Sequence, residues 1–149
     1  MRSGVVLLAL LLCSCQLTSK KGKEFSEAQR FVEQMVAKHP EIVRLTIHAV
    51  PTGETRSRII ACNVYEKRGK LSDPEDLEVM KTKKTVVLRE GNNLDVTAAI
   101  LDKAGKAIAA TGITLTFPSN TSQEALVKKA EGIAQELTGA IQAAGQPLW

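Results

Sequence analysis

The amino-acid sequence predicts an α+β domain in which a single antiparallel sheet is flanked by an N-terminal and a C-terminal helix. Three observations support this fold class. Apolar residues recur at helical spacing towards both ends of the chain, they alternate with polar residues in between, and turns rich in glycine or proline separate the alternating segments. With 149 residues, 44% of them hydrophobic and 24% charged, the chain matches about one globular domain.

The first predicted helix spans residues 24–39 and ends at His39-Pro40, because proline cannot continue a helix and restricts the residue before it. Its apolar residues follow one helical face. They are Phe25, Ala28, Val32, Met35 and Val36. We expect His39 to help cap this helix rather than to act in catalysis.

Residues 42–50 alternate between apolar and polar side chains, which predicts a half-buried strand. The apolar set is Val43, Leu45, Ile47 and Ala49, and the polar set, expected to face solvent, is Arg44, Thr46 and His48. After a turn at residues 51–54, residues 57–64 predict a second strand. This strand is richer in apolar residues, so we expect it to be central in the sheet. The two strands form an antiparallel hairpin.

A short helix is predicted at residues 73–80. Ser72 or Asp73 can cap it, and Pro74 suits its first position. The acidic residues that follow favour the positive end of the helix dipole. The short helix therefore separates the hairpin from the strands after it.

A three-stranded meander is predicted next, at residues 85–88, 94–101 and 106–117. The turn at residues 102–105 ends in a glycine, which permits a positive backbone angle. Periodicity alone does not give the order of the strands across the sheet.

The C-terminal helix is predicted to begin near Thr121, which with Glu124 resembles a capping box. Gly145 and Pro147 end it. Its apolar stripe consists of Leu126, Ala130, Ile133, Leu137 and Ile141.

The first residues indicate export. One positive charge at Arg2 precedes a short apolar run, which is too short for a transmembrane helix. Leu12-Cys13-Ser14-Cys15 resembles the lipobox of bacterial lipoproteins. The resemblance implies cleavage after Ser14, diacylation of the Cys15 thiol and further acylation with a chain such as palmitate. Cys13 is a rival site, but it would place bulky Leu12 before the cut.

The sequence therefore divides into a signal peptide (1–14), a lipid-anchored linker (15–23) and a domain (24–149). Loss of the signal removes one basic residue and lowers the formal net charge from +4 to +3. Lys20, Lys21 and Lys23 lie in the linker, where they are either simply solvated or attracted to anionic headgroups. Gln16, which is not aspartate, predicts the periplasmic face of the outer membrane in a Gram-negative cell.

Several function classes are disfavoured. The charge balance is small and aromatic residues make up only 3% of the chain, which argues against nucleic acid as a partner. After processing, Cys62 is the one cysteine that carries no lipid, and we expect a buried apolar role for it. No spacing predicts a metal site, a nucleophile motif or a bound cofactor. We therefore expect a protein that is not an enzyme.

One stretch resembles the extracytoplasmic Cache domains, which are PAS-like sensors. Its motifs are the strand and polar loop from Ile59 to the short helix, and the hairpin in which Asp102-Lys103-Ala104-Gly105-Lys106 joins an apolar strand to one rich in small residues. The resemblance covers residues 24–144. It implies a curved sheet with a small-molecule pocket on one face, closed by the loop and the short helix.

Four residues are candidates for ligand binding. Asn63 must satisfy its amide if buried, through the backbone of the following loop or through a ligand, and Tyr65 suits a pocket wall. Arg58, with Arg56, suits a carboxylate ligand, although strand arginines often face solvent. Asp95 lies on a strand face, either in solvent or in a pocket. We expect the cavity beside Asn63 and Tyr65, with Ala109, Ala110 and Gly112 leaving space.

Two functions follow as expectations. The first is a lipid-anchored extracytoplasmic module that binds or senses a small molecule and has no output domain of its own. The alternative is a structural or interaction lipoprotein that docks on an envelope complex. A concave, partly apolar cavity favours the first, whereas a filled sheet and an exposed apolar patch favour the second.

Overall fold

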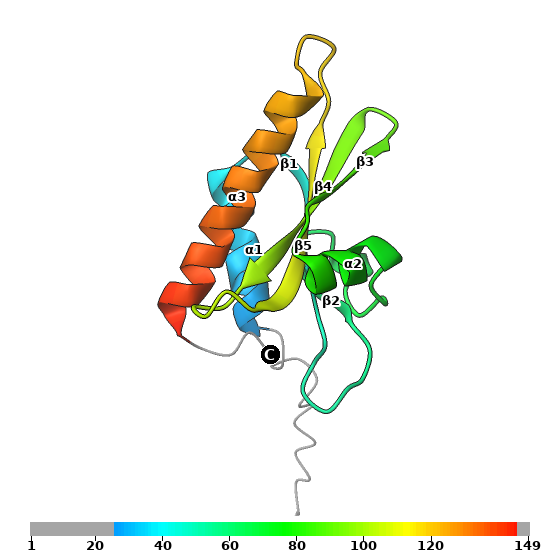
Figure 1. The fold of residues 1–149 in the computed structure, drawn as a ribbon. Helices are drawn as coiled ribbons and strands as arrows, with labels where there is room; N and C mark the ends of the chain where they lie inside the picture. Colours follow the sequence, from blue (N-terminus) through cyan, green and yellow to red (C-terminus); the bar gives the residue numbers. More distant parts are fainter. Residues whose placement is uncertain (1–25, 146–149) are drawn as a thin grey trace, which may run out of the picture.

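A computed structural model describes residues 26–145 of the chain (Figure 1). The signal peptide, the linker, Phe25 and Pro147 lie outside the described residues. The elements are α1 (Ser26–Lys38), β1 (Ile42–Ala49), β2 (Arg58–Cys62), the 3-10 turn η2 (Tyr65–Lys67), α2 (Pro74–Thr82), β3 (Val86–Glu90), β4 (Asn93–Leu101), β5 (Ala107–Thr116) and α3 (Gln123–Ala144). The predicted α+β class and the predicted order of elements are confirmed.

The five strands form one antiparallel sheet in the order β2-β1-β5-β4-β3. The hairpin and the meander therefore join side by side, with β1 paired to β5. The expectation that the second strand is central is wrong, because β2 lies at an edge of the sheet.

The apolar β2 is tolerated at the edge because other groups cover its backbone. The Gln29 side chain of α1 donates to the Cys62 carbonyl (3.2 Å) and accepts from the Cys62 N–H (3.1 Å). The loop after β2 returns along the same strand: Gly69 N donates to Ile59 O, and Ile59 N donates to Lys70 O, both at 2.8 Å. An edge strand shielded in this way does not offer free hydrogen-bonding groups to another chain.

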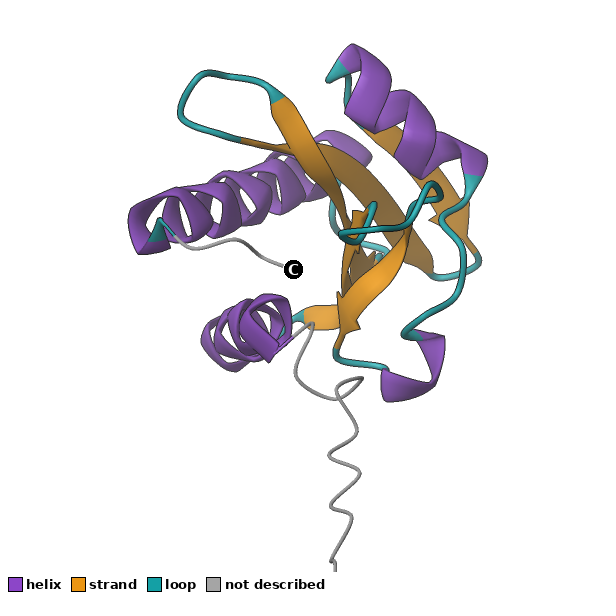
Figure 2. Ribbon diagram, turned by 90° about the horizontal axis from the view of Figure 1, so that it is seen from below, coloured by secondary structure: helices purple, strands orange, loops and turns teal. Residues whose placement is uncertain are grey.

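The helices lie on both faces of the sheet (Figure 2). α1 and α3 pack together over one face, the inner face, and α2 covers part of the other, the outer face. The core between the sheet and the two long helices includes Leu45, Ile47, Ile60, Leu94, Val96, Ile100, Ile113, Leu115 and Leu137. Burial of these side chains is the main contribution to the stability of the domain.

The prediction that Val43 of β1 faces the core is wrong. Val43 is 44% exposed, whereas its neighbour Ile42 is buried. The register of β1 against β5 shifts between Ile42 and Arg44, as at a β-bulge, so the strict alternation of side chains starts only beyond the shift.

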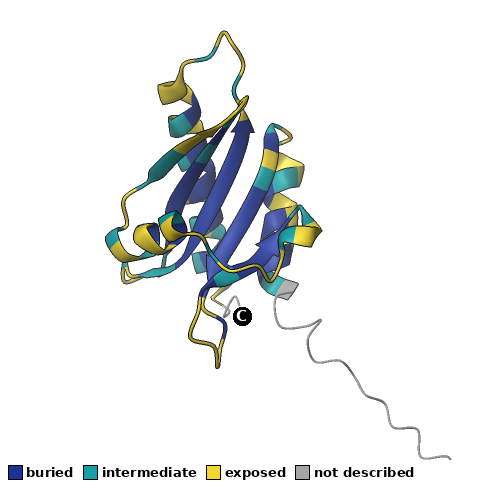
Figure 3. Ribbon diagram, turned by 90° about the vertical axis from the view of Figure 1, so that its right-hand side faces the viewer, coloured by how far each residue is buried: buried dark blue, intermediate teal, exposed yellow. Residues whose placement is uncertain are grey.

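The predicted solvent exposure of His48 is also wrong. Arg44, Thr46 and His48 do share the outer face of β1, but Thr46 and His48 are buried there. The reason is that α2 and the loop before it pack over this face, so a polar strand face is covered by protein instead of water (Figure 3).

Local capping explains where the helices begin. Asp73 is the N-cap of α2, with Pro74 as the first residue of the helix, as predicted, and the buried Asp76 carboxylate accepts from Asp73 N at 2.8 Å. α3 is capped by Ser122, whose hydroxyl accepts from Ala125 N, and not by Thr121 as predicted.

The ends of two helices are tied together by His39. Its Nε2 lies 3.0 Å from Glu136 Oε2, so the side chain links the end of α1 to α3 instead of only capping α1. α3 ends at Gly145, which adopts the left-handed conformation (φ 61°). None of the helices in residues 26–145 combines the length and apolar character that a membrane span requires.

Candidate functional site

A cavity of about 170 Å³ lies between the outer face of the sheet and the segment that carries η2 and α2. We call it the polar pocket. The sheet contributes Arg44, Thr46, His48, Ile59, Asp95 and Gly112, with Glu90 from the end of β3. The covering segment contributes Lys67, Asp73, Glu75 and Asp76. The short helix and the loop before it thus border a pocket on one face of the sheet, but Asn63 and Tyr65, beside which the sequence predicts the cavity, do not line it.

A buried polar network forms one wall of the polar pocket. His48 Nε2 lies 2.9 Å from Thr46 Oγ1, and His48 Nδ1 lies 3.0 Å from Asp76 Oδ2 and 3.1 Å from Ser72 Oγ. Ser57 Oγ and Ser72 Oγ are 2.7 Å apart. Both ring nitrogens of His48 therefore have protein partners, as buried polar atoms require. The network fixes the imidazole between β1 and α2.

Gly112 permits the close approach of β5 to this network. A Cβ at this position would lie 2.7 Å from Thr46 Oγ1, closer than real contacts allow. Gly112 N instead donates to that hydroxyl at 3.1 Å. Of the three small residues predicted to leave space, Gly112 lines the pocket. Ala109 packs in the core on the inner face.

Charged side chains surround the rest of the pocket. Arg44 Nη2 lies 3.4 Å from Asp95 Oδ2 and 3.5 Å from Glu90 Oε2, which are long contacts for ion pairs. Thr114 donates its hydroxyl to Asp95 Oδ1 at 2.7 Å and so orients that carboxylate. Because its lining is mostly charged or hydrogen-bonding groups, the pocket suits a small hydrophilic molecule better than an apolar one.

Of the four predicted ligand residues, the structure places only Asp95 in the polar pocket. Asn63 instead joins β2 to β1: Leu45 N donates to its Oδ1 (2.8 Å), and its Nδ2 donates to Val43 O (3.2 Å). The backbone of β1 therefore satisfies this amide, and the loop that follows Asn63 does not. A register-fixing role explains why an asparagine follows this apolar strand.

Tyr65 and Arg58 also lie away from the polar pocket. Tyr65 is 51% exposed, and its hydroxyl donates to Glu33 Oε1 at 2.9 Å. This hydrogen bond to a carboxylate raises the pKa of the Tyr65 phenol. Arg58 pairs with Glu54 and donates to Gly69 O, so it supports the loop after β2.

Sequence reasoning missed Thr46, His48 and Asp76 as pocket residues. The signal for them is the polar face of β1, which alternates Arg44, Thr46 and His48, together with the short helix that follows. A polar strand face is compatible with solvent or with a buried network, and only the position of α2 decides between the two.

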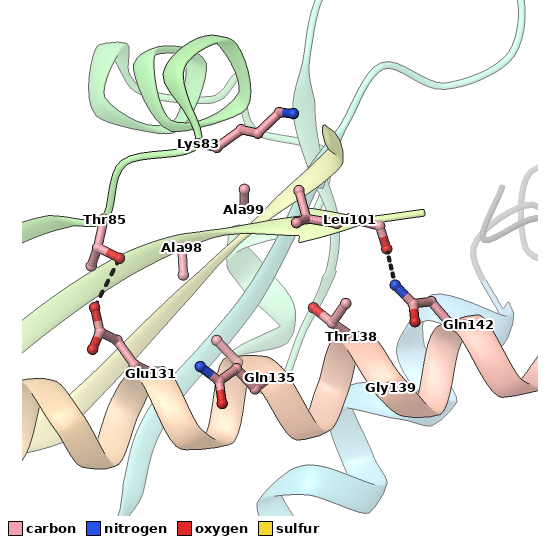
Figure 4. Close-up of a pocket in the computed structure, with 11 residues that line it drawn as sticks. Lys83, Thr85, Ala98, Ala99, Leu101, Glu131, Gln135, Thr138, Gly139 and Gln142 are labelled. Carbon is pink, nitrogen blue, oxygen red and sulfur yellow. Dashed lines mark hydrogen bonds between the residues drawn. The ribbon is translucent and has the colours of Figure 1, made fainter. Parts of the chain in front are cut away.

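A second hollow of about 380 Å³ lies between α3 and β4, next to the residues that precede β3 (Figure 4). We call it the helix groove. Its walls include the small residues Ala98, Ala99 and Gly139. Hydrogen bonds bridge it at two places: Thr85 donates to Glu131 (3.0 Å), and Gln142 donates to Leu101 O (2.9 Å). Thr85, Glu131 and Gln142 are thus engaged within the protein. The polar pocket is the stronger candidate site because more charged side chains line it.

A third hollow, also about 380 Å³, lies between the β1–β2 loop and α2. We call it the apolar hollow. Val50, Leu71 and Leu77 line it and are each more than two-fifths exposed. These three side chains form a small exposed apolar surface.

Cys62 is a free, buried thiol whose pKa is raised mainly by burial, so it is poorly suited to act as a nucleophile. Among residues 26–145, no three His, Cys, Asp or Glu side chains lie close enough together to hold a metal ion.

No protein-family model matches the chain, and no curated protein matches it in sequence. Solved structures resemble its fold. The GAF domain of nlh2 from A. aeolicus, in an inactive state, superposes with a TM-score of 0.61 at 14% identity, over 82% of this chain and 86% of that one. The repressor BlcR from Agobacterium tumefaciens gives a TM-score of 0.50 at 15% identity, over 82% of this chain and 70% of that one. The domain has a GAF-like, PAS-like fold.

Proposed function

We propose that the protein is a lipid-anchored, extracytoplasmic module that binds or senses a small hydrophilic molecule in the polar pocket. The observation that supports this most directly is the pocket itself. It is a concave space on the outer face of the sheet, with charged groups around it and a buried network along one wall. Fold alone does not determine function, so the proposal depends on this site.

The size and lining of the polar pocket define the ligand class. Its volume of about 170 Å³ is below the roughly 300–1,000 Å³ of sites for drug-sized ligands, so we infer a molecule of few heavy atoms. Arg44 and Lys67 can neutralise an acidic group, and Asp95 or Glu75 can accept from an amine. Amino acids and small amines or carboxylates are therefore the first compounds to test.

A thermal-shift screen of such compounds tests ligand binding. A ligand at a hundred times its Kd stabilises the folded state by about 2.7 kcal/mol, which is easily detected. Arg44→Met should weaken binding at least tenfold, because it removes the guanidinium at the pocket. Arg30→Met removes the same group from the exposed surface of α1 and should bind like the parent.

Two results would contradict ligand binding at this site. One is the absence of any stabilising compound across the screen. The other is a ligand that binds the Arg44 and Arg30 variants equally well, which would place its site elsewhere.

The lipid anchor is supported by the motif Leu12-Cys13-Ser14-Cys15. Metabolic labelling with a fatty-acid analogue tests it: Cys15→Ser should lose both the label and membrane retention, because thioether attachment needs the thiol. Cys13→Ser is the matched control and should keep both. Persistent label on the Cys15 variant would refute the assignment.

The envelope location follows from the same motif. With Gln16 after the lipidated cysteine, we expect the periplasmic face of the outer membrane in a Gram-negative cell. Fractionation of the membranes tests this, and Gln16→Asp should move the protein to the inner membrane.

A second candidate function is docking on an envelope protein through the apolar hollow. The exposure of Val50, Leu71 and Leu77 around one hollow favours it. A photo-crosslinking residue in place of Leu77 should then give one discrete adduct in cells. The same residue in place of Leu88, another exposed leucine, should not.

A further inference from the structure

Five exposed lysines form one basic surface, which we call the lysine surface. Lys81, Lys83 and Lys84 come from the end of α2, and Lys103 and Lys106 come from the β4–β5 turn. The two segments touch directly, because Lys83 Nζ donates to Gly105 O at 2.7 Å.

The ammonium groups of the lysine surface lack the carboxylate contacts that other lysines of the domain make. None of its five ammonium groups forms an ion pair within residues 26–145, whereas Lys38 and Lys129 do so elsewhere. The nearest acidic residue in sequence, Asp102, uses its carboxylate inside the turn, where it accepts from the N–H groups of Ala104 and Lys106 at 2.9 Å. The surface is therefore free to attract an external anion.

The position of this surface relates it to the proposed membrane anchor. The β4–β5 turn lies at the same end of the molecule as the start of α1 (Figure 1). The chain between Cys15 and Ser26 can span at most about 40 Å when fully extended, so an anchored domain stays close to the headgroups. Lys20, Lys21 and Lys23 in that stretch add charge of the same sign.

We propose that the lysine surface rests on anionic phospholipid headgroups and so orients the anchored domain on the membrane. The inference depends on the lipid anchor proposed above, because a single turn and a helix end bind lipid weakly without one. Each lysine near an anionic membrane contributes about 1 kcal/mol of attraction. Together these residues would hold one end of the domain against the membrane and leave the opposite end free.

Vesicle sedimentation tests this without the lipid anchor. The protein is the processed chain, residues 15–149 with Cys15→Ser, which contains the whole described core. The vesicles are phosphatidylcholine alone or phosphatidylcholine mixed with phosphatidylglycerol. The chain should bind the mixed vesicles more tightly, and the double variant Lys103→Gln/Lys106→Gln should bind them about 30-fold more weakly, from two lysines at about 1 kcal/mol each.

The matched control is Lys70→Gln/Lys128→Gln, which removes the same charge from exposed positions outside the lysine surface. It should lose much less affinity than the first double variant. Equal loss in the two variants, or equal binding to both kinds of vesicle, would overturn the proposal. Release of the chain by millimolar inorganic phosphate, but not by another salt at the same ionic strength, would also overturn the proposal. That result would indicate a specific ion site.

These outcomes are separable from a failure of the proposed function. Fatty-acid labelling of Cys15 tests the anchor in cells, and the thermal-shift screen tests the polar pocket without vesicles. If the chain is labelled at Cys15 but shows no preference for anionic vesicles, the proposed lipid anchor stands and the proposed role of the lysine surface is refuted.

Discussion

His48 of β1 and Asp76 of α2 contact each other across the outer face of the sheet, with 3.0 Å between Nδ1 and Oδ2 and side chains only 6% and 5% exposed. Asp76 also accepts from Asp73 N at the start of α2. One carboxylate therefore caps the helix and holds it on the sheet. This contact closes one side of the polar pocket.

Removal of the Asp76 carboxylate should destabilise the domain. Asp76→Ala loses a helix cap, worth about 1 kcal/mol, and removes the carboxylate from the buried His48 Nδ1, whose remaining partner is Ser72 Oγ, at a cost of about 1–3 kcal/mol. We expect a loss of about 2–4 kcal/mol in the free energy of unfolding, measured by urea denaturation with circular dichroism. Glu78→Ala, an exposed position of the same helix, should change little. Equal midpoints for the two variants would show that the contact is not stabilising.

Two glycine substitutions should have opposite effects. Gly112→Ala forces a methyl group against Thr46 Oγ1 and should cost about 1–3 kcal/mol, as overpacking does in a dense interior. Gly132→Ala in α3 has open space around the new methyl group and should gain up to about 1 kcal/mol from helix propensity. Thermal melts of the two variants measure both effects. A neutral Gly112 variant would mean that β5 moves away from Thr46 at little cost.

Local sequence patterns predict most of the fold. Helical and alternating periods locate the elements, because burial on one face imposes those periods on the chain. These patterns fail at β2, whose apolar residues predicted a central strand although β2 lies at an edge of the sheet. Its edge is instead protected by Gln29 and by the returning loop at Gly69, and neither contact has a local signature in the sequence.

The site is less predictable than the fold for a related reason. The general location of the pocket follows from the order of elements and from small residues such as Gly112. Its chemistry depends on which side chains α2 covers, and His48 gains its partners only through that tertiary contact. Asn63 illustrates the converse. As an isolated polar residue it suggested a ligand site, but its side-chain amide is hydrogen-bonded to the backbone of β1.

Glu136 should make the stability of the domain sensitive to acid. Hydrogen bonds from Lys38 and then His39 lower its pKa from the usual 4.5. A carboxyl group with a depressed folded-state pKa stabilises the protein fully above its unfolded pKa and loses that contribution as the pH falls through the folded-state value. Glu136→Gln should therefore be less stable than the parent at neutral pH, with the difference shrinking below pH 4.5.

Urea unfolding at several pH values measures this difference. Glu66→Gln, at an exposed position in η2, is the control and should follow the parent at every pH. If the gap between the Glu136 variant and the parent persists unchanged in acid, the contacts with Lys38 and His39 do not act through the carboxylate charge.

Leu137 provides the test of how α3 packs on the sheet. Its side chain is fully buried in the core, so Leu137→Asp removes apolar burial, worth about 2–5 kcal/mol, and adds a charge with no partner. Because small domains have a total stability of about 5–15 kcal/mol, this variant should be largely unfolded. Lys128→Asp places the same residue on the exposed side of α3 and should remain folded. Circular dichroism and thermal melting compare the two. A Leu137 variant that melts like the Lys128 variant would mean that α3 does not bury this stripe against the sheet.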